Sequence, residues 1–321
     1  METKLVNGHN QFVFSEEDKK IIYDLFVNQG YSQRGLMRVF GCTQRPISRV
    51  LNEMGLDHSR GNLTSFKYNF PEGLYDEEVE KKVIKQLQTI PSYKSKYKIN
   101  EYYFDDIRNP DVIYTIGFLY ADGCNHNCKS ISMSLEEQDG YILERMNQNI
   151  QNEKPIRFVD MSNKHDFGYT YKNQYSWCIY NRRIAEALNV LGIVPRKSLI
   201  LEFPKWLHPS LYSQFLLGVF DGDGSVCKGD RVKTMPRFLL TITSTEQFCK
   251  AIVDICASQI GIRGHIYDAS NHNGITKVFA LSGSNVVKKF MDWMYQDSTI
   301  YLQRKYNRYC EYFNINNSLS A

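Results

Sequence analysis

The sequence predicts an α+β protein in which a small all-helical N-terminal domain precedes two similar half-domains. An apolar stretch of helical length that ends in Asp-Gly occurs twice, at 113–123 and 211–224. Its two aspartates, Asp122 and Asp223, are about one hundred residues apart, the length of one small domain. Similar strand and helix patterns follow both stretches. Two half-domains of the order αββαββα, related by approximate two-fold symmetry, are therefore expected.

Composition sets the outer limits. The 321 residues are 42% hydrophobic and 23% charged, which is typical of a globular chain of two or three domains. The net charge of +4 permits nucleic-acid binding without demanding it. No apolar run is long enough for a membrane span. Eight cysteines and no signal-peptide pattern favour reduced thiols in the cytoplasm of a bacterial or phage-infected cell, with an organelle also open.

The N-terminal region predicts a helix-turn-helix. Residues 1–13 are expected to form a tail, and 14–58 three short helices whose first residues follow Ser15, Ser32 and Thr43. The third helix is expected to present side chains to base edges and phosphates of a major groove: Gln44, Arg45, Ser48 and Arg49. The alternative is a trihelical packing module with solvated arginines.

Residues 59–100 are expected to be a linker with one short amphipathic helix over 76–87. A basic, aromatic run follows at 92–98 and carries Lys94, Lys96 and Lys98. These lysines suit a DNA backbone, and a solvated linker explains them equally well.

The two half-domains are expected at 101–200 and 201–321. In each, a capping box marks the helix after the first hairpin, at Ser134–Glu137 and at Ser244–Gln247. Each closing helix is followed at a matching place by a basic pair, Arg196-Lys197 and Arg304-Lys305.

Paired motif helices would bring two acids together. Gly117 and Gly218 would let the helix backbones approach along a seam between the half-domains. Asp122 and Asp223 would then be neighbours at negative helix ends, where like charges need a counter-charge. Mg²⁺ or another divalent cation with oxygen ligands is the expected solution. The glycines that follow the two acids are expected to be left-handed caps.

Other interpretations of these motifs fit less well. A single Asp-Gly would be an ordinary turn. An EF-hand starting at Asp221 fails, because Val226 and Val232 occupy the positions that require Gly and Glu. The loop from Cys124 to Cys128 resembles half a zinc site but has no second pair, which favours a hairpin turn.

The two stretches Thr115–Gly123 and Leu216–Gly224 resemble the paired motifs of single-chain LAGLIDADG homing endonucleases. The resemblance implies a monomer whose antiparallel sheets form a saddle on double-stranded DNA. It also implies a Mg²⁺-dependent double-strand break at a long asymmetric target, and often an intron-encoded gene. The acid before the last glycine of each motif binds metal in this family, which assigns catalytic and metal-binding roles to Asp122 and Asp223.

The family's supporting basic residues carry over less directly. A lysine that the family often places at the start of the closing helix corresponds to Arg182 in the first repeat. Ser284 occupies that place in the second repeat, and Lys277 is the expected substitute. Asp221 has Tyr120 as its counterpart, so it is expected to act only within its own repeat. The N-terminal helix-turn-helix is an addition to the family pattern.

Two non-endonuclease activities stay open on the same fold. One is a DNA-binding regulator that does not cleave, and the other is an RNA maturase. Regulators of this kind typically lose the motif acids, whereas both are present here, which favours cleavage.

Overall fold

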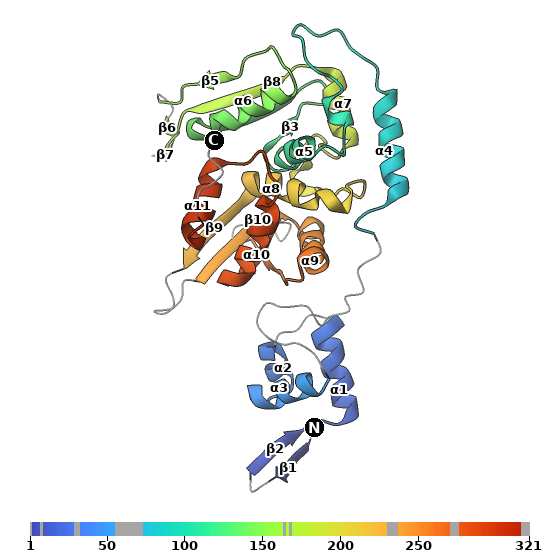
Figure 1. Cartoon of the computed structure of the whole chain (residues 1–321), viewed down its shortest axis with the longest axis vertical. Helices are drawn as coiled ribbons and strands as arrows, with labels where there is room; N and C mark the ends of the chain where they lie inside the picture. The colour runs from blue at the N-terminus through green and yellow to red at the C-terminus, as the bar shows by residue number, and fades with distance from the viewer. Residues whose placement is uncertain are drawn as a thin grey trace. The chain divides into compact units, whose positions relative to one another are not determined.

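The computed structural model describes residues 2–6, 9–28, 33–54, 73–162, 165–166, 169–229, 237–269 and 276–315 (Figure 1). The chain divides into two compact units, one of Met1–Phe70 with Cys256–Arg263 and one of Pro71–Ile255 with Gly264–Ala321. The described part is α+β, as predicted, with two four-stranded antiparallel sheets.

The first residues of the chain differ from the expected tail. Strands β1 (Glu2–Val6) and β2 (His9–Val13) pair antiparallel, with Glu2 opposite Val13.

Three helices follow within the predicted 14–58 domain: α1 (Glu16–Tyr23), α2 (Gln33–Val39) and α3 (Gln44–Glu53). Ser15 and Asp18 form a capping box, because each side chain accepts from the other residue's backbone N–H, at 3.1 and 3.0 Å. Thr43 precedes α3 without a side-chain capping bond, and Ser32 lies outside the described residues. The three helices share an apolar core that contains Phe14, Ile22, Phe26, Leu36, Phe40, Ile47, Val50 and Leu51.

The amphipathic helix expected over 76–87 is α4 (Glu77–Thr89), and it packs on the first repeat. Its Glu80 pairs with Arg108, whose Nε lies 2.7 Å from the carboxylate. Arg183 of the first repeat donates to the carbonyl of Leu87, 3.2 Å away. Residues after Pro71 therefore belong to the same compact unit as the repeats.

The first repeat has the predicted order of helices and strands. Its elements are α5 (Pro110–Asp122), β3 (Cys124–Asn125), β4 (Ile131–Glu136), α6 (Gly140–Asn149), β5 (Arg157–Val159), β8 (Gln174–Ile179) and α7 (Arg182–Val190). The sheet order is β3-β4-β8-β5, and a small ladder of β6 (His165–Asp166) and β7 (Tyr169–Thr170) lies between β5 and β8 in sequence.

The second repeat follows the same plan with longer strands. Its elements are α8 (Tyr212–Asp223), β9 (Gly224–Gly229), β10 (Arg237–Thr245), α9 (Glu246–Ile260), β11 (His265–Asp268), β12 (Thr276–Ser282), α10 (Ser284–Tyr295) and α11 (Gln303–Phe313). The sheet order is β11-β12-β10-β9.

Both predicted capping boxes are wrong. Ser134 lies inside strand β4 and Ser244 inside strand β10, because each strand continues almost to the start of the following helix. At α9 the cap is the next residue, Thr245, whose hydroxyl accepts from the backbone N–H of Phe248 at 3.2 Å.

Helices α5 and α8 lie side by side between the two sheets and form the seam between the repeats (Figure 1). Both are buried along most of their length. A Cβ on Gly117 would lie 2.1 Å from the carbonyl oxygen of Phe215, and one on Gly218 would lie 2.2 Å from that of Tyr114. Any larger side chain at either glycine would force the helices apart.

No helix in the described ranges combines the length and the apolar character needed to cross a membrane.

Candidate metal centre

Asp122 and Asp223 are the last residues of the two seam helices, α5 and α8. The final turns of these helices touch, since a Cβ on Gly222 would lie 2.3 Å from Cβ of Ala121 and 3.2 Å from Oδ2 of Asp122. Both carboxylates keep a face open to solvent. Two acids from different repeats thus meet at one end of the seam, where each helix has its negative pole.

The glycines after the two acids are not left-handed caps, contrary to the prediction. Gly123 has φ −73° and Gly224 has φ −90°, both in extended backbone that any residue can adopt. Glycine is required at both positions because there is no room for a Cβ atom. A Cβ on Gly123 would lie 2.6 Å from the carbonyl of Leu119, and one on Gly224 would lie 2.2 Å from the ring of Phe220.

The surroundings of the two acids disfavour their charged forms. Partial burial, followed by repulsion from Asp122, raises the pKa of Asp223 from 3.8 to about 6. Burial also raises the pKa of Asp122, against the opposing charges of Lys305, Lys197 and Arg304. The buried side of each carboxylate accounts for the raised pKa, although the other side is exposed to solvent. A divalent cation between the acids would relieve the repulsion.

Each repeat contributes one buried lysine to this end of the seam. Lys197, in the 3-10 turn η4 (Lys197–Leu199), donates to the carbonyls of Ala121 and Gly123, at 3.1 and 2.8 Å. Burial lowers the pKa of Lys197, while the charges of Asp223 and Asp122 raise it.

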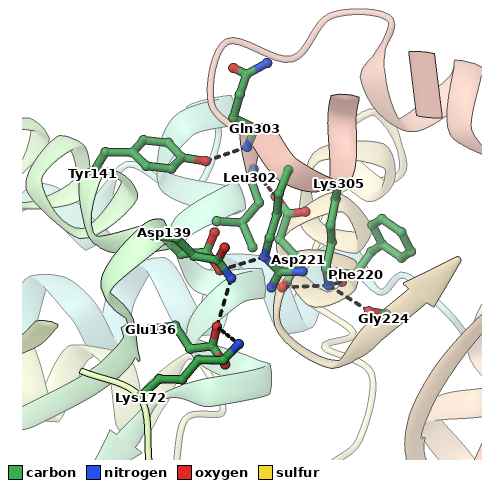
Figure 2. Close-up of polar contacts among 12 residues, drawn as sticks. Glu136, Asp139, Tyr141, Lys172, Phe220, Asp221, Gly224, Leu302, Gln303 and Lys305 are labelled. Carbon is green, nitrogen blue, oxygen red and sulfur yellow. Dashed lines mark hydrogen bonds and ion pairs between the residues drawn. The ribbon is translucent and has the colours of Figure 1, made fainter. Parts of the chain in front are cut away.

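Lys305 in the first turn of α11 occupies the corresponding place in the second repeat (Figure 2). It donates to the carbonyls of Phe220, Asp221 and Gly224, at 2.5, 2.8 and 2.7 Å. Burial lowers the pKa of Lys305 to about 8. The sequence placed each lysine in one of two matching Arg-Lys pairs, but no role was predicted for either lysine. The Arg-Lys pair that follows the closing helix of each repeat was the signal that could have found them.

The two basic residues assigned by resemblance lie elsewhere. The guanidinium of Arg182 bonds Glu186 at 2.7 Å and lies over the ring of Tyr93. Neither Arg182 nor Lys277 is among the cations that act on the pKa of Asp122 or Asp223.

Lys277 is directed away by strand register. It lies on the same face of β12 as the buried Phe279 and Leu281, the side of the sheet that the helices cover. It pairs with Asp268 on the neighbouring strand β11. The basic groups beside the acids are therefore Lys197 and Lys305 in place of the pair taken from the resemblance.

Asp221 was expected to act only within its own repeat, but its carboxylate also contacts the other repeat. Its Oδ2 atom accepts from the hydroxyl of Tyr114 in the first repeat and from the backbone N–H of Leu302, both at 2.8 Å. The carboxylate is buried, which raises its pKa to about 6. Its counterpart Tyr120 instead donates to the carbonyl of Leu191, at 2.6 Å. Asp221 is thus a buried bridge between repeats, set back from the exposed acids.

The donor set fits a hard divalent cation. Mg²⁺ typically binds one or two protein carboxylates and completes its shell with water and substrate phosphate oxygens. Across the described ranges no group of three or more His, Cys, Asp or Glu side chains could hold a metal. The stretch Cys124–Cys128 forms strand β3 and the first part of the hairpin turn to β4, and all eight cysteines, which lie in described segments, are free of disulfide bonds.

The predicted DNA-contacting residues fall on two exposed segments. On α3, Arg45, Ser48 and Arg49 line one shallow surface hollow, and Gln44 begins the helix. Lys94, Lys96 and Lys98 are exposed on the segment after α4. Tyr93 anchors that segment by hydrogen bonding to Glu186, at 3.2 Å.

The alternate residues of the sheets offer a second kind of surface. On β4 and β8, polar side chains alternate with buried Met133 and Trp177, and small hydroxyls such as Ser132 and Ser176 face the other way. On β10, Thr241 occupies the corresponding face between buried Leu240 and Ile242.

No protein-family model matches this chain, and no curated protein matches its sequence. Solved structures similar to it include the LAGLIDADG homing endonuclease I-GzeII in complex with its DNA target, with 13% identity and a TM-score of 0.44 over 64% of this chain and 89% of that one. The LAGLIDADG homing endonuclease I-LtrWI bound to target DNA has 12% identity and a TM-score of 0.43 over 65% and 91%. I-SmaMI bound to uncleaved DNA with calcium ions has 15% identity and a TM-score of 0.41 over 63% and 90%. At this level of similarity, the function of the chain has to follow from its own residues.

Proposed function

We propose that this chain is a site-specific DNA endonuclease that depends on a divalent cation and breaks both strands of a long asymmetric target. The observation that carries the proposal is the meeting of Asp122 and Asp223 at one end of the seam, where buried Lys197 and Lys305 bond the carbonyls that follow the acids and their charges act on both carboxylates. Exposed carboxylates with raised pKa values are costly in an ordinary fold, which favours a functional role.

Asp122 and Asp223 would hold Mg²⁺ or another divalent cation. When bound, such a cation supplies a Lewis acid that favours attack by water and stabilises the leaving 3′-oxygen. The positive charges of Lys197 and Lys305 lower the pKa of Asp223 and so favour the ionised form that binds a cation. In the net hydrolysis, a water oxygen bonds to phosphorus and the 3′ O–P bond breaks, leaving a 5′-phosphate and a 3′-hydroxyl.

The two-fold relation of the repeats suits the two antiparallel strands of a duplex. One acid and one lysine per repeat would serve one strand each. The exposed sheet residues would contact bases, and Lys94, Lys96 and Lys98 would neutralise phosphates. Arg45 and Arg49 of α3 would add contacts to a neighbouring major groove, as a helix-turn-helix does. We place this activity in the cytoplasm, with a monomer as the active form.

Supercoiled plasmid carrying DNA from the chain's own locus, with the insertion removed, tests the proposal. With Mg²⁺ we expect linear product with defined ends, and none in EDTA. Asp122→Asn and Asp223→Asn should bind the same DNA without linearising it. Specific binding by the wild-type protein without a break under Mg²⁺ or Mn²⁺ would instead support a regulator, and cleavage that both variants retain would refute the assigned acids.

A further inference from the structure

The N-terminus of α11, which carries Lys305, is held from several sides by side chains of other elements (Figure 2). Leu302, Gln303 and Arg304 each bond a side chain of another element, whereas Lys305 bonds backbone carbonyls at the end of α8. A helix N-terminus leaves its first backbone N–H groups without partners inside the helix. Leu302 offers no side-chain cap of its own, so partners must come from elsewhere in the fold.

Two of these partners belong to the opposite repeat. The hydroxyl of Tyr141, in the first turn of α6, accepts from the backbone N–H of Gln303. Asp139, just before α6, accepts from Nε of Arg304 at 2.7 Å, and its carboxylate is almost completely buried. The first repeat therefore fixes both the backbone and one side chain of the segment that presents Lys305.

The counterpart lysine is presented differently. Lys197 begins a three-residue 3-10 turn, after Arg196 in a left-handed conformation with φ 57°. The turn ends at exposed Leu199 and is followed by exposed Ile200, in place of a long helix. The two lysines reach the equivalent carbonyls of Gly123 and Gly224 from unlike supports, so a change at Tyr141 or Asp139 should disturb one lysine and spare the other.

We propose that Tyr141 and Asp139 are positioning residues for Lys305, and that cleavage of one DNA strand depends on them while cleavage of the other does not. This inference rests on the endonuclease function proposed above. It assigns to the first repeat a positioning role in the half-site that Lys305 serves. Neither residue touches the acids, and both act through the N-terminus of α11.

Strand-resolved cleavage tests the proposal. A duplex target with a different fluorophore on each strand would be cut under single-turnover conditions by wild type, Tyr141→Phe and Asp139→Asn. Each variant should slow one strand on the order of tenfold and leave the other within about twofold, because small misplacements are costly in catalysis. Plasmid substrate should accumulate as nicked circles. DNA affinity should not change.

Thr299→Val is the matched control. Thr299 donates to Asp111 across the same repeat boundary, three residues before Leu302, but has no contact with Lys305. A second test combines Tyr141→Phe with Lys305→Met. If Tyr141 acts through Lys305, the double variant should cut no more slowly than Lys305→Met alone.

Equal slowing of both strands, additive effects in the double variant, or the same bias in Thr299→Val would each overturn the inference. Hydrogen exchange separates its failure from failure of the endonuclease itself. If folded wild-type protein cuts neither strand, the proposed function fails. The positioning is then judged by the Gln303 amide, which should exchange faster in Tyr141→Phe than in wild type and Thr299→Val; no difference would refute it.

Discussion

The ammonium group of Lys305 donates to the carbonyl of Gly224 at 2.7 Å, one residue beyond the acid that ends α8. Lys197 makes the same contact with Gly123 at 2.8 Å, one residue beyond the acid that ends α5. A lysine at the negative end of a helix stabilises that end, and here it also offsets the charge of the terminal carboxylate. The repeated pairing of lysine and glycine carbonyl defines the two halves of the candidate site.

Replacing either lysine by methionine should slow the cleavage of one DNA strand. We expect Lys197→Met and Lys305→Met to reduce the single-turnover rate on one labelled strand on the order of 10²-fold, since one preorganised positive group is lost. The strand affected should differ between the two variants. A gel assay with separately labelled strands measures this. Loss on the same strand in both variants would refute the assignment of one lysine to each half-site.

A cation should stabilise the folded protein through the two acids. A ligand that binds only the folded state raises the melting temperature. We expect Mg²⁺ or Ca²⁺ to raise the melting temperature of wild type, and to have little effect on Asp122→Asn and Asp223→Asn. Differential scanning fluorimetry without DNA measures this independently of cleavage. An equal rise in all three proteins would place the cation elsewhere.

Without a cation, Asp223→Asn should be more stable than wild type near pH 7. Because the pKa of Asp223 is raised from 3.8 to about 6, the folded protein binds this proton more tightly than the unfolded chain. Wild type therefore loses stability as pH rises from about 4 to about 6, and an amide at this position does not. Melting in EDTA from pH 4 to pH 8 should show a gap that closes toward pH 4. A gap of constant size would contradict the raised pKa.

An alanine at Gly117 or Gly218 should destabilise the seam by about 1–3 kcal/mol or more, because the new methyl group meets backbone instead of a side chain that can move. Ile116→Val on α5 is the control, expected to cost about 1 kcal/mol through a small cavity. Urea unfolding followed by circular dichroism compares them. A cost for the glycine variants no greater than that of the control would mean that the helices can separate freely.

Arg45→Ala and Arg49→Ala should weaken DNA binding without changing the cleavage rate of bound target. Each lost phosphate contact should lower the slope of log affinity against log salt by about 1, whereas a lost base contact would relax specificity at one position. Lys20→Ala on α1, an exposed lysine on another helix, is the control. If affinity at several salt concentrations is unchanged in both arginine variants, α3 does not contact the DNA.

Local sequence was enough to predict the repeated order of helices and strands and the place of Asp122 and Asp223 at the ends of two buried helices. The apolar runs before Asp122 and Asp223 define buried helices, and the chain leaves each helix directly after the acid because an extended glycine follows. Such patterns depend on residues a few positions apart, which a single sequence displays. The order of helices and strands along the chain in each half-domain follows from similar local patterns.

Only the tertiary structure decided which basic groups accompany the acids. Lys277 looked suitable by its position in sequence, but the register of β12 places it on the helix-covered side with Phe279 and Leu281. Asp221 reaches Tyr114 across the seam, and Leu302 comes to the same carboxylate from the far end of the chain. Contacts between residues so distant in sequence depend on how helices and sheets pack, and no local sequence pattern determines the free energy of that packing.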